Sequence, residues 1–174
     1  MRIRASLLLL TGLALLVAPA AGAEVMSEVT FTFHEADTYT FVAQVTFTGE
    51  NASTYRSNAD LDGDQLVSED EEAAVRGALT DLTEDVNRSD HRLDGGLPET
   101  IEVTNMTFQN LTGPVVQGGE LVFRTTATYR YAVNASSHEL TVARAATGPN
   151  ATFLVTLLGP PGYQLTNLTG FDLK

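Results

Sequence analysis

Apolar side chains recur at every second position over most of this chain, with the segment between residues 60 and 94 as the exception. Near the start, Val29, Phe31 and Phe33 alternate with threonines. Further alternating runs lie at 39–47, 121–131 and 153–157. A period of two with threonine on one face is typical of half-buried antiparallel strands. With glycine and proline turns between the runs, the pattern predicts a mainly β fold, an antiparallel β-sandwich of about seven strands.

The segment from Asp60 to Asp94 holds twelve of the 22 acidic residues, and its apolar period is helical. Four apolar residues at spacings of four, three and four share one helical face: Val75, Leu79, Leu82 and Val86. Ser68 is a suitable N-cap, and the acids after it suit the positive end of the helix dipole. We therefore predict a helix from Ser68 to about Arg88. It belongs to a loop-helix insert, residues 60–90, between the second and third strands.

The start of this insert carries oxygen ligands at a regular spacing. Carboxylates at positions 1, 3 and 5, a backbone carbonyl at 7, a hydroxyl at 9 and a glutamate at 12 can surround a hard cation with about 6–8 oxygens. The residues are Asp60, Asp62, Asp64, Leu66, Ser68 and Glu71. Residues 60–71 thus resemble the calcium loop of EF-hand proteins. The resemblance implies a Ca²⁺ site closed by a bidentate Glu71, and this shell suits Mg²⁺ less well.

The loop departs from the EF-hand pattern in three respects. Position 6, where glycine is expected, is Gln65, and holding it at positive φ would cost about 1–3 kcal/mol. The incoming helix would have to fit into Ala52–Ala59, two turns at most, and no second loop exists to pair with the first. We therefore expect a lone, weak site. The alternative is an acidic, solvated turn that caps the following helix.

The first 23 residues have the features of a secretory leader. Arg2 and Arg4 precede an apolar stretch of about a dozen residues, which is shorter than the roughly 20 needed to span a bilayer. The stretch ends in Ala21-Gly22-Ala23, a small-x-small cleavage pattern. We expect cleavage before Glu24, which leaves 24–174 as a single β-rich domain without a membrane span. An uncleaved anchor is the alternative.

Seven of the eight asparagines stand in Asn-x-Ser/Thr sequons. They are Asn51, Asn87, Asn105, Asn110, Asn134, Asn150 and Asn167. This density exceeds what the serine and threonine content explains, so we expect N-glycosylation at several of them on a secreted or cell-surface protein. One site poses a conflict, because strict alternation places Asn105 on the same face as the apolar Ile101 and Val103. Either the strand ends or bulges near Thr104, or Asn105 is unmodified.

The composition excludes several classes of function. A net charge of −12, which becomes −14 without the leader, disfavours nucleic-acid binding, and the lack of cysteine excludes disulfides and thiolate metal sites. The three histidines are isolated, expected in turns or at the surface, and no catalytic motif is present. We therefore predict a non-enzymatic, calcium-binding surface glycoprotein with a structural or interaction role. A calcium sensor or adhesion domain that binds another cell-surface protein is the first alternative, and a secreted hydrolase the second.

Overall fold

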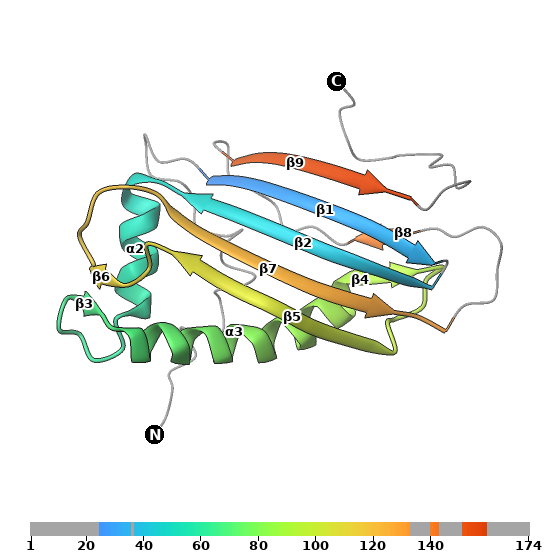
Figure 1. Cartoon of the computed structure of the whole chain (residues 1–174), viewed down its shortest axis with the longest axis horizontal. Coiled ribbons are helices and arrows are strands. Elements are labelled where there is room, and N and C mark those ends of the chain that lie inside the picture. Colours follow the sequence, from blue (N-terminus) through green and yellow to red (C-terminus); the bar gives the residue numbers. More distant parts are fainter. Residues whose placement is uncertain (1–24, 36, 133–139, 143–150, 160–174) are drawn as a thin grey trace.

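The computed structural model describes residues 25–35, 37–132, 140–142 and 151–159. Its helices and strands follow one another along the chain as drawn in Figure 1. They are β1 (Val25–Glu35), β2 (Thr38–Phe47), α2 (Gly49–Ala59), β3 (Leu66–Val67), α3 (Glu69–Asp90), β4 (His91–Leu93), β5 (Thr100–Gln109), β6 (Gly113–Pro114), β7 (Leu121–Arg130), β8 (Leu140–Val142) and β9 (Ala151–Leu158).

Five long strands form one sheet in the order β5-β7-β2-β1-β9. All neighbours are antiparallel except β1 and β9, which run parallel. Two small ladders, β3 with β6 and β4 with β8, lie outside this sheet. The prediction of a mainly β fold is therefore confirmed. The purely antiparallel seven-stranded sandwich is not confirmed, because among the described residues the sheet is mixed and a helical segment packs on it where a second sheet was expected.

One face of the sheet is apolar and the other carries threonines. The odd-numbered residues of β2 and β7 point inward, and Tyr39, Phe47, Leu121 and Tyr129 are fully buried. The even-numbered residues of both strands, such as Thr126 opposite Val42, lie on what we call the open face. The alternation predicted from the sequence is thus correct for these strands, and the inward face supplies the core.

The two helices α2 and α3 flank the 60–71 loop and cover the end of the sheet formed by β2, β5 and β7. The side chains of Tyr55 in α2 and of Val75 and Leu79 in α3 belong to one buried cluster with Phe47 and Phe123 of the sheet. The preceding helix corrects the sequence prediction. It spans eleven residues from Gly49, which is about three turns rather than two. The sequence did not predict its first turn because the helix has only a weak amphipathic pattern and is stabilised by tertiary packing.

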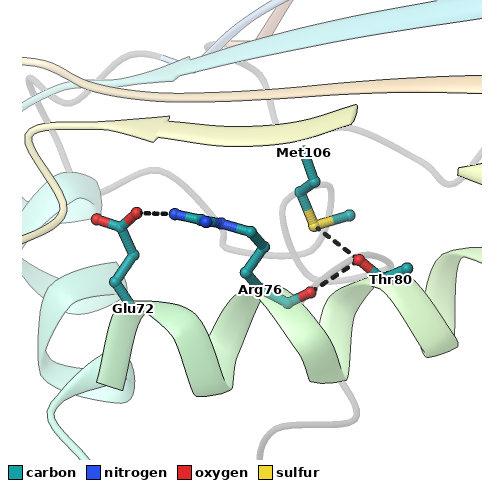
Figure 2. Close-up of polar contacts among 4 residues, drawn as sticks. All are labelled: Glu72, Arg76, Thr80 and Met106. Atoms are coloured by element: carbon teal, nitrogen blue, oxygen red, sulfur yellow. Dashed lines mark hydrogen bonds and ion pairs between the residues drawn. The ribbon is translucent and has the colours of Figure 1, made fainter. Parts of the chain in front are cut away.

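Helix α3 runs beside β5, in agreement with the helix predicted from Ser68 to about Arg88. The hydroxyl of Thr80 donates to the carbonyl of Arg76 (2.9 Å) and lies 3.8 Å from Sδ of Met106 in β5 (Figure 2). One turn earlier, Arg76 pairs with Glu72 across the exposed surface of the helix (Figure 2). The sulfur contact and the buried Leu79 together fasten the helix to the sheet.

Strand β5 contains a β-bulge at Thr104. Val103 pairs with Ala127 and Asn105 pairs with Thr126, the next residue of β7. Thr104 is therefore an extra residue in β5 without a partner position in β7. The bulge moves Asn105 to the open face, where it is exposed, and returns Met106 to the core. This resolves the conflict at Asn105 in favour of the bulge foreseen near Thr104.

A second core cluster surrounds His91, the first residue of β4. Its Nδ1 is hydrogen-bonded to the hydroxyl of Tyr39 (2.8 Å), which also bonds the hydroxyl of Tyr131 (3.0 Å), and its ring stacks on Tyr129. Burial lowers the pKa of His91 to about 4. The expectation of a turn or surface position is therefore wrong for His91, while it holds for the exposed His34; His138 lies outside the described residues.

Candidate metal centre

Asp60 is the residue around which the 60–71 loop winds. Its Oδ1 accepts hydrogen bonds from the backbone N–H groups of Gly63 (2.8 Å) and Asp64 (3.2 Å), and its Oδ2 accepts from that of Gln65 (3.0 Å). Three successive donors on one carboxylate curl the chain into a tight arc. The sequence folds this way because aspartate has a side chain short enough to bond the backbone a few residues ahead.

Two further aspartates continue the arc. Oδ1 of Asp62 accepts from the N–H of Asp64 (3.1 Å), and Oδ1 of Asp64 accepts from the N–H of Leu66 (2.8 Å). Each bond spans two residues, the spacing at which an aspartate closes a turn on its own backbone. The alternation of Asp60, Asp62 and Asp64 therefore forms the loop as well as supplying its carboxylates.

Glu71 closes the loop from the first turn of α3. Its Oε1 accepts from the N–H groups of Leu61 (2.6 Å) and Asp62 (3.2 Å). Its Oε2 accepts from the N–H (2.8 Å) and the hydroxyl (2.9 Å) of Ser68, which caps the helix. The N–H of Ser68 is the main cause that lowers the pKa of Glu71, and the bonds from Leu61 and Asp62 add to it. Glu71 is thus a bound carboxylate at the N-terminus of a helix, in a reciprocal capping box with Ser68.

Of the six predicted ligands, the structure brings three carboxylates together. One carboxylate oxygen from each of Asp60, Asp62 and Glu71 lies within 4.8 Å of the other two. Asp64 is outside this group and bonds Leu66 instead. The hydroxyl of Ser68 is directed to Glu71, one of the three grouped residues. The three grouped oxygens are close enough to bind one divalent cation, and without a cation their charges repel one another.

The turn expected at Gln65 has the predicted strained conformation. Gln65 has φ +72°, in the left-handed region that disfavours side chains, and Gly63 before it has φ +81°. No atom lies within 4 Å of a Cβ built on Gly63. Position 63 therefore favours glycine because of its positive φ, and not because a side chain would clash with a neighbour. The departure from the EF-hand pattern at position 6 therefore leaves the geometry of the loop intact and stores strain in it.

The connection between β5 and β7 holds the far side of the loop. Strand β3 pairs with β6, and the N–H of Val115 donates to the carbonyl of Gln65 (3.0 Å). Val67, at position 8 of the loop, is buried with Val115 in the first core cluster. The 60–71 loop thus has a pairing partner, supplied by a hairpin connection rather than by a second calcium loop.

Arg56 in α2 fixes this connection and was not foreseen from the sequence. It is fully buried, with Nε donating to the carbonyl of Asn110 (2.9 Å) and one Nη to that of Gln117 (3.2 Å). Burial lowers the pKa of its guanidinium. The signal was present in the sequence, because Ala52, Arg56 and Ala59 share one face of a helix once that helix is extended back to Gly49.

The sequons fall in different environments. Asn105 and Asn110 are exposed, although Nδ2 of Asn110 donates to the carbonyl of Glu120 (3.0 Å). Asn51 is 3% exposed in α2, which is incompatible with a glycan on the folded chain. Asn87 lies in α3, and its side chain is outside the described part of the structure. The other three sequons, Asn134, Asn150 and Asn167, lie outside the described residues.

No family model, curated protein or solved structure matches this chain. Among the described residues, no helix is both long and apolar enough to cross a membrane. The described residues therefore define the class of this protein by architecture. It is a mixed β-sheet whose second and third long strands are joined by a helix–loop–helix segment, and the loop clusters three carboxylates.

Proposed function

We propose that this chain is a secreted or cell-surface glycoprotein in which residues 60–71 bind one Ca²⁺ and thereby stabilise the fold. The observation that carries the proposal is the clustering of Asp60, Asp62 and Glu71 at the junction of α2 and α3. These carboxylates come from both ends of the loop, so a cation bound between them would join the end of α2 to the start of α3. The buried Val67 at position 8 and the positive φ of Gln65 at position 6 add support, since an EF-hand loop turns sharply at position 6 and directs an apolar residue inward at position 8.

The donor set fits calcium better than a smaller cation. Asp64 at position 5 and the carbonyl of Leu66 at position 7 would add to the three clustered carboxylates on binding, and all of these donors are hard oxygens. Glu71 already presents two oxygens that bond four donors, so a bidentate contact requires the exchange of these hydrogen bonds for the ion. Because that exchange costs free energy, we expect weak binding, with Kd of about 10⁻⁵ to 10⁻³ M.

A structural role for the ion is favoured over a sensor role. Sensors open a pair of helices and expose an apolar groove. Here Val75 and Leu79 of α3 are 0% and 1% exposed and pack against the sheet, so opening would expose the main core. We therefore propose that calcium holds the α2–loop–α3 segment against β2, β5 and β7. A calcium-dependent contact with another cell-surface protein stays the alternative, and no enzymatic activity is proposed.

Titration calorimetry on the mature chain from Glu24, with Ca²⁺ and Mg²⁺ in turn, tests this function. We expect one saturable calcium site, little heat with Mg²⁺, and a melting temperature that falls with chelator. At free calcium tenfold above Kd, the ion adds about 1.4 kcal/mol to the free energy of unfolding. A sensor would instead show calcium-dependent binding of a hydrophobic dye. If neither calcium nor chelator changes the melting temperature, residues 60–71 form an acidic turn and not a calcium site.

Export rests on the leader pattern in residues 1–23 and on the sequons. N-terminal sequencing of the exported protein should start at Glu24 or within about two residues of it. A protein that retains Met1 would instead be a membrane-anchored ectodomain.

A further inference from the structure

Strand β9 is an edge of the large sheet without the usual protection against further pairing. It bonds β1 on one side, and among the described residues no strand lies on its other side (Figure 1). Its sequence, ATFLVTLL, has no charge and no proline. Leu154 and Leu158 are 57% and 49% exposed on the open face. Because alternate backbone N–H and C=O groups of an edge strand point outward, its natural occupant is another extended strand.

The opposite edge, β5, is protected in four ways. It carries a bulge at Thr104, an exposed charge at Glu102 and an exposed sequon asparagine, Asn105, in mid-strand. Helix α3 also runs beside it, far from β9 (Figure 1). Bulges and charges are the devices by which β proteins prevent edge-to-edge association. Their presence on β5 alone indicates that association at β9 is tolerated.

We infer that β9 is the interface through which two copies of this chain associate, in antiparallel fashion, into one continuous ten-stranded sheet. A two-fold axis perpendicular to the sheet pairs β9 with itself and keeps the open face of one copy beside that of the other. Leu154 and Leu158 then meet the same row of the partner. On the inner face, the half-buried Val155 and Leu157, which pack against the second core cluster, gain the cover that the edge lacks.

The charge distribution leaves β9 as a strand at which two copies can meet. Without the leader each chain carries a net charge of −14, which opposes self-association over most of its surface. Strand β9 is neutral, so two copies can approach there without placing like charges opposite each other. The inference is independent of the calcium proposal, because β9 lies at the edge of the sheet away from α3 and shares no ladder with β3 or β6.

Sedimentation of the full mature chain from about 1 to 100 μM, in chelator, tests the inference. We expect a monomer–dimer equilibrium. Thr156→Glu, on the open face of β9, should weaken dimerisation at least tenfold, since the two-fold axis brings the two added charges together. Thr100→Glu places the same charge on the open face of β5 without altering a sequon and should leave the equilibrium unchanged, since Thr100 and Thr156 are both exposed threonines of edge strands.

Spin labels provide a second measurement that does not require dissociation. The chain has no native cysteine, so Thr156→Cys and Thr107→Cys can be labelled singly. In the proposed dimer the labels at Thr156 should lie within about 20 Å of each other, whereas those at Thr107, nine strand spacings apart, should lie about 40 Å apart. A monomer over the whole range, which would mean that other residues of the chain or another partner occupy β9, overturns the inference. Equal loss of dimer in both glutamate variants, or a ladder of larger oligomers, overturns it as well.

Discussion

The backbone N–H of Val115 donates to the carbonyl oxygen of Gln65 over 3.0 Å, although the two residues are fifty positions apart. This bond joins the strained turn of the proposed calcium loop to the connection between β5 and β7. Val115 is itself anchored in the core, and the buried Arg56 holds the same connection at Asn110. Strained residues persist where the surrounding structure over-determines them, and these contacts do so for Gln65.

Gln65→Gly should tighten calcium binding. Glycine adopts φ +72° without the roughly 1 kcal/mol cost of a side chain, so the loop presents its carboxylates more readily and Kd should fall about threefold to tenfold. Gly63→Ala is the matched opposite, because φ +81° with free space around the new Cβ adds backbone strain and nothing else. Calorimetry on both variants should show Kd moving in opposite directions. If Kd changes in the same direction in both variants, calcium affinity does not depend on the backbone strain of the loop.

Glu71→Gln should abolish most of the calcium-dependent rise in melting temperature. Glutamine keeps an acceptor for the capping box with Ser68, so the calcium-free protein should stay folded, but the bidentate carboxylate is lost. Glu69→Gln removes the same charge from an exposed position of the same helical turn and should retain the response. The measurement is the melting temperature with calcium and with chelator. If Glu71→Gln responds like the parent chain, Glu71 is a helix cap and not a ligand.

Deletion of Thr104 should be tolerated, whereas deletion of Thr107 should not. Without Thr104 the bulge disappears, yet Val103 still faces Ala127 and Met106 still faces Thr125, so the inward face of β5 is unchanged. We expect a loss of about 1 kcal/mol. Without Thr107, Phe108 moves to the opposite face and leaves the core, which should cost about 3 kcal/mol or more. Urea unfolding of the two variants measures the difference, and similar losses would contradict the assigned register.

The free energy of unfolding should decrease as the pH falls below about 6.5 because of His91. Its pKa of about 4 in the folded protein lies below the unfolded value of 6.5, so the unfolded state binds the proton first. Stability is fully present above pH 6.5 and is lost between 6.5 and 4, by about 1 kcal/mol from pH 7.5 to about pH 5.5. His91→Phe keeps the stack on Tyr129, leaves Tyr39 its bond to Tyr131, and should remove this loss.

Urea unfolding at these two pH values, in chelator so that calcium does not contribute, provides the measurement. His34→Gln is the control, because His34 is exposed on β1, where its Nε2 is hydrogen-bonded to the hydroxyl of Thr40 (2.7 Å). If His34→Gln loses the pH dependence of unfolding and His91→Phe retains it, the buried His91 is not the cause of that dependence.

Glycans should be found at Asn105 and Asn110 and not at Asn51. The first two are exposed, and the third is buried in α2 with Nδ2 in the interior. Mass spectrometry of peptides from the exported protein of the native host measures occupancy at each site. A fully occupied Asn51 would require α2 to pack differently, and unmodified peptides at both exposed sites would remove the support that the sequons give to the surface-glycoprotein proposal.

Much of the candidate site could be predicted because its interactions are local. Asp60, Asp62 and Asp64 bond the backbone two to five residues ahead, Ser68 and Glu71 cap the helix between them, and Gln65 lies in the predicted turn. Such bonds depend on spacing along the chain and little else. The departure of Asp64 from the carboxylate group was not predictable, because it depends on distances within the folded loop that spacing does not specify.

The sequence by itself determined the strand period, the position of the insert and the loop, since each follows from residues close together in the chain. Tertiary structure alone decided what covers the sheet, because a periodic apolar face shows only that it is buried and not whether a helix or a second sheet buries it. It also decided that β9 joins β1 in parallel, and that Arg56 and His91 lie inside. Those outcomes depend on partners such as Asn110 and Tyr39, more than fifty positions away, whose approach is set by the packing of the whole chain.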